Sequence, residues 1–245
     1  MEVRAHTPYG PPSAAVTVGR VGQRAVAFLP RHGLAHEWPP HRVNYRANLW
    51  ALRELGVRRV IGPSAVGSLR PDVAPGELVV LDQLVDRTSG RSDTYLDGPV
   101  AGHVSFADPY CPELGEVLAS AAEGVGARVH RGGTVVVVQG PRFSTRAESA
   151  WFRSQGWDVV NMTQYPEAYL ARELGLCYAG LALVTDHDTG LDGDDTVEAV
   201  THEAVLAVLA ATVRTARAVI ERAVPAVPDT PGCGCRSLGW PGFTT

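Results

Sequence analysis

Long apolar stretches without polar alternation are the feature that most restricts how this chain can fold. Residues 134–138 and 178–185 are built largely of Val, Ala, Leu and Gly, which is typical of strands buried on both faces of a sheet. Between such stretches lie segments with apolar residues at helical spacing, the longest at 196–223. This alternation predicts an α/β fold: a single domain with a central mixed β-sheet flanked by helices.

The individual elements and the domain boundary can be predicted at the same level. The expected strands are 14–18, 24–29, 59–62, 78–84, 134–138, 158–162 and 178–185, and the expected helices are 43–55, 112–123, 145–155, 165–174 and 196–223. Residues 1–224 are predicted to form the one domain. Residues 225–245 are rich in Pro and Gly, and we expect this tail to be disordered.

Charge composition excludes several functions. All 22 Lys+Arg residues are arginine, so the chain has neither a Schiff-base lysine nor the lysine of a phosphate-binding P-loop. The net charge of −4 argues against a nucleic-acid partner, because such binders carry a basic stripe. No apolar run approaches the roughly 18 residues of a membrane span, and the first residues lack an apolar signal core. We therefore expect a cytoplasmic protein with no membrane partner.

Metal and redox sites are not predicted from the cysteines. Cys111 and Cys177 lie in apolar surroundings, which suggests core residues or free thiols. Cys233 and Cys235 form a C-x-C pair in the tail, and neither arrangement has the spacing of zinc ligands. A redox role for the C-x-C pair stays open, and a mass change on reduction would reveal its disulfide.

Other catalytic motifs fail on geometry or number. His36, Glu37 and His41 give H-E-x-x-x-H, one residue longer than the zinc protease motif, and two prolines interrupt the helix that this motif needs. The single D-T-G that begins at Asp188 lacks the second loop of an aspartic protease. Neither G-x-S-x-G nor G-x-G-x-x-G occurs, which argues against an α/β-hydrolase and a dinucleotide-binding domain.

Polar residues instead follow several predicted strands. They are 31–32, 161–163 and 185–188, together with a small-residue turn at 63–68 of the kind that binds anions. Taken alone, the segment 29–33 is more simply a surface turn. Because ligands of α/β proteins usually bind beyond the carboxyl ends of strands, the convergence of these segments predicts a small-molecule site.

Two long motifs and several shorter ones resemble a known family. The long motifs are GPRFSTRAES at 140–149 and NMTQYPEA at 161–168, which is followed by ALVTDHD at 182–188. The shorter ones, in the same order as in the family, are RHG at 31–33, VNYRAN at 43–48, AVGSLR at 65–70, DQ at 82–83, DRT at 86–88 and ADPYCP at 107–112. Over roughly residues 6–224 the chain resembles the methylthioadenosine phosphorylase branch of the trimeric purine nucleoside phosphorylases.

The resemblance implies a pentosyltransferase of purine and methionine salvage. Inorganic phosphate would cleave 5′-methylthioadenosine to adenine and 5-methylthioribose 1-phosphate. Phosphate is then a co-substrate, and neither a metal nor an organic cofactor is implied. A homotrimer is the expected assembly.

The same resemblance assigns roles to individual residues. The implied phosphate ligands are Arg31, His32, Ser64, Ala65 and Thr163. The implied nucleoside contacts are Phe143, Ser144, Met162, Asp186, His187, Asp188 and His202, with His103 reaching the pocket of a neighbouring subunit. Asp186 and Asp188 would be the catalytic pair, because two nearby carboxyls raise one pKa and let that group donate a proton to the purine. A carboxylate also suits the 6-amino group of adenine.

Two departures from the family leave alternatives open. His202 stands where the methylthioadenosine branch is apolar, and a histidine there suits a 5′-hydroxyl, so a purine nucleoside phosphorylase acting on adenosine, inosine or guanosine is the alternative. The chain also enters at about residue 6 without the family's first strand and Gly-rich loop. A truncated, weakly active nucleoside-binding relative is therefore the third possibility.

Overall fold

The computed structural model describes residues 1–99, 101–190 and 202–244, leaving aside the side chains of 202–207. The strands are β1 Glu2–Val3, β2 Val16–Val21, β3 Arg24–Phe28, β4 Arg59–Ser68, β5 Leu78–Val80, β6 Gln83–Arg87, β7 Val129–Arg131, β8 Thr134–Val138, β9 Val159–Asn161 and β10 Cys177–Asp186. The helices are α1 Tyr45–Glu54, α2 Pro112–Gly124, α3 Arg146–Ser154, α4 Gln164–Glu173 and α5 His202–Ala226, with a 3₁₀ turn η1 at Pro40–Arg42.

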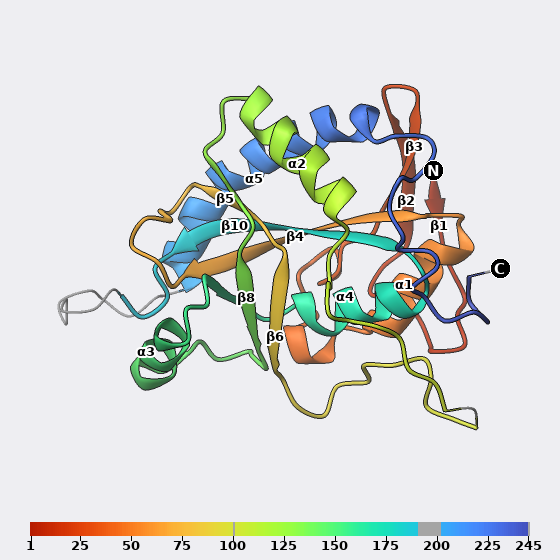
Figure 1. Cartoon of the computed structure of the whole chain (residues 1–245), viewed down its shortest axis with the longest axis horizontal. Coiled ribbons are helices and arrows are strands. Elements are labelled where there is room, and N and C mark those ends of the chain that lie inside the picture. Colours follow the sequence, from red (N-terminus) through yellow and green to blue (C-terminus); the bar gives the residue numbers. More distant parts are fainter. Residues whose placement is uncertain (100, 191–201, 245) are drawn as a thin grey trace.

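The predicted α/β domain with a central mixed sheet is confirmed. Within the described residues the main sheet has seven strands in the order β6-β8-β9-β4-β10-β5-β7, and β1, β2 and β3 form a separate three-stranded sheet. Figure 1 shows the small sheet at one end of the molecule and α3 at the other.

The two longest strands, β4 and β10, form the parallel pair at the centre of the main sheet. Their register runs from Arg59↔Cys177 to Val66↔Val184 and shifts by a bulge before Asp186↔Gly67. Every residue of β10 before Asp186 is buried, because the strand has hydrogen-bonded neighbours on both edges and helices on both faces. The apolar run in the sequence is therefore the middle of the fold.

Alternate side chains of β10 enter two separate cores. Leu181 packs with α2 and α5 on one face, in a cluster that includes Leu118 and Val219. Val184 packs with α1 and α4 on the other face, in a cluster that includes Leu49 and Leu170. In Figure 1 these two pairs of helices lie above and below the strands. Helices therefore cover both faces of the sheet at β10.

The structure differs from the sequence predictions for three segments. The expected turn at 63–68 is the second half of β4, held extended by β10 on one side and β9 on the other. The expected strand 78–84 is divided between β5 and β6. The strand 24–29 is observed as β3, but in the small sheet. The predicted start of the last helix at 196 lies outside the described residues.

The C-terminal tail packs on the domain, which differs from the expected disorder. Beyond α5, the Trp240 amide donates to the Glu173 carbonyl over 2.9 Å, and the Arg53 guanidinium donates to the Phe243 carbonyl over 2.7 Å. The Phe243 ring meets Trp50 edge-on with centroids 5.8 Å apart. Composition predicted fraying, but the large aromatic side chains of the tail find apolar surface on α1 to cover.

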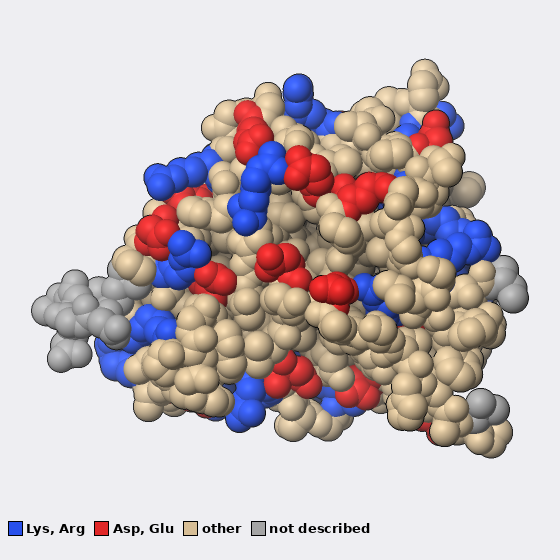
Figure 2. Space-filling model, in the orientation of Figure 1, with Lys and Arg blue, Asp and Glu red and all other residues tan. Residues whose placement is uncertain are grey.

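The surface carries charges of both signs. On the face shown in Figure 2, arginine and acidic side chains are interspersed, without a large field of one sign. In the part of the chain that the structure describes, no helix combines the length and the apolar character that a membrane crossing requires.

A glycine pair at the centre of the sheet is expected to be essential for stability. Gly62 and Gly180 are register partners, and a Cβ on Gly180 would lie 2.8 Å from both Gln164 Oε1 and Leu81 Cδ1. Overpacking of this kind costs about 1–3 kcal/mol, so Gly180→Ala should lower the free energy of unfolding in urea by that amount. The matched control is Gly19→Ala in β2, where a Cβ meets nothing within 4 Å. Equal effects of the two substitutions would contradict this account.

Candidate active site

Polar groups meet where the parallel strands β10 and β4 end side by side, at the register pair Asp186↔Gly67. At Gly67 a Cβ would lie 2.9 Å from Asp186 Oδ1 and 3.1 Å from Asp188 Cβ. Only a residue without a side chain lets the two carboxyl-bearing residues approach the strand this closely. The bulge that ends β10 re-aims the chain at this point, as bulges beside functional sites commonly do.

The two aspartates of this loop differ in their partners. Asp186 accepts hydrogen bonds on both oxygens, from Thr185 Oγ1 and from the Asp188 backbone N–H, each over 2.7 Å. Asp188 has a positive φ of 52°, and its Oδ2 is buried without a hydrogen-bond partner in the described chain. Burial, opposed by the Thr185 hydroxyl, raises the pKa of Asp186. Burial, opposed by the Ser149 hydroxyl, raises the pKa of Asp188. Asp188 is thus the carboxyl better placed to carry a proton.

Further buried polar atoms on the predicted segments lack protein partners. In the described chain these are Ser144 Oγ, Asn161 Oδ1 and His187 Nδ1, in addition to Asp188 Oδ2. Buried polar groups in folded proteins nearly always have a partner. These atoms, on the loop before α3, at the end of β9 and on the loop after β10, are able to hydrogen-bond a polar ligand.

A clamped arginine lies on the other side of β4. Glu167 accepts from Arg31 through Nε at 2.6 Å and Nη2 at 2.5 Å, while Arg31 Nη1 donates to the Pro63 carbonyl over 3.0 Å. The Tyr178 hydroxyl adds a third hydrogen bond to Glu167 over 2.8 Å. Burial opposes the charge of Arg31, but the Glu167 carboxylate raises its pKa overall. Of its five N–H groups two remain, in a fixed plane beside Ser64, and can bind an anion.

Hydroxyl donors stand next to this guanidinium. Ser64 Oγ accepts from Asn161 Nδ2 over 3.1 Å and from Gln164 Nε2 over 3.2 Å, which leaves its own proton to donate. Thr163 is buried, and its side chain makes no cap hydrogen bond to α4. Ala65 is the exposed residue next to Ser64 on β4. Arg31, Ser64 and Ala65 therefore lie along the same part of β4, and Thr163 follows Asn161, which contacts Ser64.

His32 is held by its own loop. Its Nδ1 lies 2.8 Å from the Trp38 carbonyl, so Nδ1 carries the proton and Nε2 is left for a ligand. Its ring stacks on His36 with centroids 4.7 Å apart. Burial lowers the pKa of His32, so the ring is neutral at neutral pH. A neutral imidazole can accept from a protonated oxygen of an anion.

The loop between β8 and α3 supplies an exposed aromatic ring. Phe143 is 42% exposed, and its loop is anchored by Arg142, which pairs with Glu148 at 2.7 Å, and by the capping box of Thr145 and Glu148. At Gly140, a Cβ would lie 2.5 Å from Met162 Sδ, so this loop touches the segment after β9. Phe143, Ser144 and Met162 therefore border one region, and an unpaired ring there can stack on a flat ligand.

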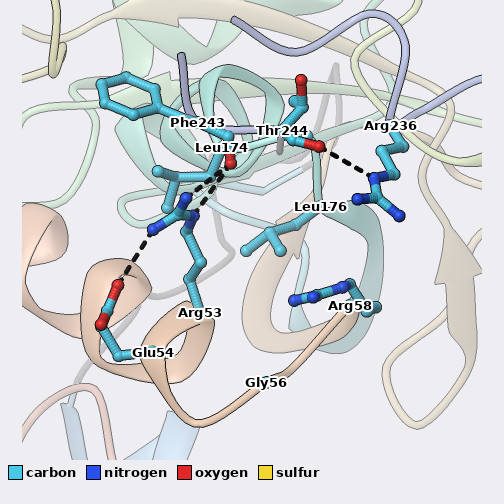
Figure 3. A pocket seen from close by; sticks show the side chains of 10 residues that line it. Arg53, Glu54, Gly56, Arg58, Leu174, Leu176, Arg236, Phe243 and Thr244 are labelled. Carbon is cyan, nitrogen blue, oxygen red and sulfur yellow. Dashed lines mark hydrogen bonds and ion pairs between the residues drawn. The ribbon is translucent and has the colours of Figure 1, made fainter. Parts of the chain in front are cut away.

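Of the remaining predicted residues, one lies apart from this region and the side chain of the other is not described. His103 is exposed, and the adjacent Gly102 packs against the Trp240 ring of the C-terminal tail. His202 begins α5, but its side chain lies outside the described residues. A cavity of about 250 Å³ lies elsewhere, between α1 and the C-terminal tail (Figure 3), and none of the predicted site residues lines it.

The buried residues that hydrogen-bond to the site residues and support them were not predicted from the sequence. Glu167, Gln164 and Tyr178 receive no role in the sequence analysis, although all three are buried polar groups of the site. Asn161, Gln164 and Glu167 belong to the motif at 161–168. One signal for Glu167 was available: it is a charged residue between apolar positions of a predicted helix. Because a charge is buried only with a partner, this pattern indicates a paired carboxylate.

Comparison with known proteins identifies the kind of molecule this chain resembles. The model of the phosphorylase superfamily matches residues 2–225. S-methyl-5′-thioadenosine phosphorylase of Mycolicibacterium smegmatis is 65% identical over 198 residues, which are 81% of this chain and 74% of the relative. Purine nucleoside phosphorylase of Streptomyces coelicolor is 57% identical over 235 residues, or 93% and 83%. Methylthioadenosine phosphorylase from Schistosoma mansoni in complex with adenine superposes with a TM-score of 0.89 at 38% identity, over 94% of this chain and 87% of that one.

The Arg31–Glu167 ion pair gives a prediction about stability. Glu167→Gln removes the counter-charge and leaves a buried guanidinium, which typically costs about 3–5 kcal/mol. Tyr178→Phe is the matched control, because it removes only one hydrogen bond to the same carboxylate and should cost about 1 kcal/mol. Urea unfolding of the two variants measures the difference. A Glu167→Gln protein as stable as Tyr178→Phe would show that the ion pair is not what holds Arg31.

Proposed function

The chain belongs to the phosphorylase superfamily, and on that basis we propose that it cleaves 5′-methylthioadenosine with inorganic phosphate to adenine and 5-methylthioribose 1-phosphate. This is the reaction of a pentosyltransferase. Its relatives include both an S-methyl-5′-thioadenosine phosphorylase and a purine nucleoside phosphorylase. Both names describe phosphorolysis of a purine nucleoside, and family members use phosphate as a co-substrate.

The proposal is supported by two kinds of group that lie along the second half of β4, between Pro63 and Gly67. Arg31, Ser64 and Thr163 offer N–H and O–H donors. Asp188 offers a buried, unpartnered carboxyl oxygen with a raised pKa at the end of β10. Phosphorolysis needs this pair of chemistries, because an anion attacks one face of the anomeric carbon while negative charge moves to the leaving purine on the other.

The steps follow from these groups. A phosphate held by Arg31, Ser64, Ala65 and His32 attacks the anomeric carbon, and the bond from that carbon to the purine nitrogen N9 breaks. The transition state has oxocarbenium character, with positive charge on the sugar that the phosphate faces. Protonated Asp188 gives its proton to purine N7, and the base leaves as neutral adenine. Asp188 acts on the charge that develops on the purine only in the transition state, whereas the phosphate ligands position an anion that is charged from the start.

Asp186 acts as a positioning group in this scheme. Its Oδ1 accepts from the Asp188 backbone N–H, which holds the loop at a positive φ of 52°. Phe143 stacks on the base, and Met162 lies against the ribose. Ser144 and His187 are further contacts of the nucleoside, and His202 is assigned to the 5′ group.

A preference for 6-aminopurines follows from the carboxyl pair. A carboxylate oxygen accepts a hydrogen bond from an exocyclic amino group and repels a 6-oxo group. The Schistosoma mansoni relative is described in complex with adenine, which is a 6-aminopurine. We assign the 5′-methylthio nucleoside ahead of a 5′-hydroxyl nucleoside because the methylthioadenosine motifs are the more numerous ones. We also assign a homotrimer in the cytoplasm, with His103 directed at the neighbouring subunit, by resemblance to the family.

A phosphorolysis assay tests the function directly. The purified protein is given methylthioadenosine, adenosine, methylthioinosine or inosine, with and without phosphate, and release of the free base is measured. We expect phosphate-dependent release of adenine, with the highest kcat/KM for methylthioadenosine. Equal turnover of the 6-amino and 6-oxo nucleosides would refute the role given to the carboxyl pair. Binding of nucleoside without any phosphate-dependent release would mean a nucleoside-binding relative.

The pH profile of Asp188→Asn tests the proton donor. In the wild type, kcat/KM should fall as pH rises past the raised pKa of Asp188, because the deprotonated carboxylate has no proton to give. An asparagine amide donates a hydrogen bond at any pH, so the variant should lose this part of the profile while its maximal rate drops by roughly 10²-fold, in line with the loss of a general acid. Ionisation of phosphate affects both proteins equally, so the difference between the profiles reports Asp188. Identical profiles would remove Asp188 from this role.

A further inference from the structure

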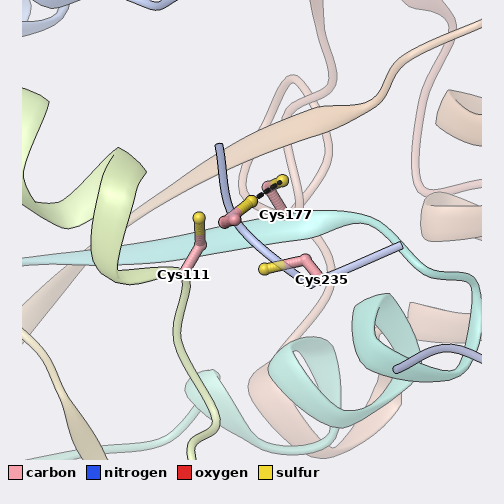
Figure 4. Close-up of side chains that lie close together, drawn as sticks. Cys111, Cys177 and Cys235 are labelled. Carbon is pink, nitrogen blue, oxygen red and sulfur yellow. Dashed lines mark hydrogen bonds between the residues drawn. The ribbon is translucent and has the colours of Figure 1, made fainter. Parts of the chain in front are cut away.

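The four cysteines of the chain meet at the end of the sheet opposite to the candidate active site. The Sγ atoms of Cys111, Cys177, Cys233 and Cys235 all lie within 4.8 Å of one another. Figure 4 shows the labelled thiols between the start of α2 and the first residues of β10. Among the described residues they form the single group of three or more His, Cys, Asp or Glu side chains that could hold a metal ion. We propose that these four thiols bind one zinc ion, which fastens the C-terminal tail to the domain.

The geometry is that of a closed tetrahedral site. With zinc–sulfur bonds of about 2.3 Å, the sulfur atoms of a tetrahedral site are about 3.8 Å apart. The Cys177 and Cys233 sulfurs lie 3.4 Å apart, and the widest separation is at most 4.8 Å, so shifts of about 1 Å or less would complete the site. All four ligands are cysteines and none leaves a position for water, which is typical of a structural rather than a catalytic zinc.

The surroundings fit a metal-bound thiolate. Cys111 is the N-cap of α2, and the Leu114 amide donates to its sulfur over 3.4 Å. The Cys111 amide donates to the Tyr178 carbonyl over 2.8 Å, which fixes Cys111 beside the start of β10. Backbone donors of this kind orient sulfur ligands and spread their negative charge. Cys111, Cys177 and Cys235 are buried in an apolar cluster, where water does not compete for the ion.

The chemistry of binding is balanced without an oxidant. Zn²⁺ replaces the four thiol protons, which are released to solvent, and no electron is transferred. Two disulfides are the competing outcome. They would need the sulfurs to be close only within each of two pairs, and the two pairs could lie apart. Here all four sulfurs lie close to one another, and all four thiols are free. The sequence could not predict this site, because its ligands come from three segments that are far apart in the chain.

The zinc would hold a long stretch of the tail in place. The Gly232 amide donates to Glu113 over 2.5 Å, and Arg236, Phe243 and Thr244 form one wall of the cavity in Figure 3. Arg236 is already exposed, but loss of the ion should loosen the backbone of the tail beyond Val227, so that the bond after Arg236 can enter the active site of trypsin. Cys177 and Asp186 begin and end the ten-residue strand β10, which spans about 30 Å. The zinc site and the proposed phosphorolysis can therefore fail independently.

Metal analysis of the purified full-length protein tests the proposal. We expect about one zinc per chain in the wild type and less than about one tenth of that in the Cys233→Ala/Cys235→Ala double variant. Ser237→Ala is the matched control in the same segment, since it removes a hydroxyl that donates to the Gly234 carbonyl and keeps all four thiols. It should retain the zinc. Wild type stripped of metal and then loaded with Co²⁺ should show the thiolate-to-cobalt charge-transfer band.

Two further readouts keep the proposal falsifiable if the double variant does not fold. Chelator-treated wild type should be cut by trypsin after Arg236 at least several-fold faster than the zinc-loaded protein. The mass of the denatured wild type should not change on reduction. A mass increase on reduction would show disulfides and overturn the proposal, as would reduced wild type that takes up neither Zn²⁺ nor Co²⁺.

Discussion

The parallel pairing of β4 and β10 is the constraint on which the rest of the structure depends. These two strands are long, central and buried, and two glycines, Gly62 and Gly180, stand side by side in their register. The missing side chains leave room for Tyr178 and Gln164 to lie across the sheet. Those two residues in turn bind Glu167 and Ser64. A polar layer is thus built onto the apolar centre of the fold, and the candidate site rests on it.

Glu167 connects this layer to the part of the chain that lies outside the main sheet. Arg31 follows β3 of the small sheet, and its pairing with Glu167 on α4 brings it back to β4. The Glu167 carboxylate therefore holds the Arg31 guanidinium in position, and an anion could bind Arg31 without contacting Glu167. β10 carries a different chemistry at each end: it begins with the Cys177 thiol and ends with the Asp186 carboxyl, which Asp188 follows. The rigid strand keeps the two regions apart.

The class of fold and most of the elements were predictable, whereas the roles given to the site residues stay predictions. Residues 134–138 were predicted as a strand and are observed as β8 with the same boundaries. Predictions from local sequence patterns were wrong where contacts with distant segments determine the conformation. Segment 63–68 looks like a turn because of its small residues, yet pairing on both edges extends it. The tail looks disordered because of its Pro and Gly content, yet Trp240 and Phe243 pack on the domain.

The sequence by itself determined that this chain forms an α/β domain of the phosphorylase type, because apolar periodicity and ordered motifs are local and need no knowledge of contacts. Only the tertiary structure decided which atoms face one another. Among the described residues it left Asp188 Oδ2 without a partner, while both oxygens of Asp186 accept hydrogen bonds. It also gathered four cysteines that are up to 124 positions apart, from Cys111 to Cys235, into one cluster. Partners and burial arise from packing between distant segments, and these set protonation and metal affinity more strongly than residue type does.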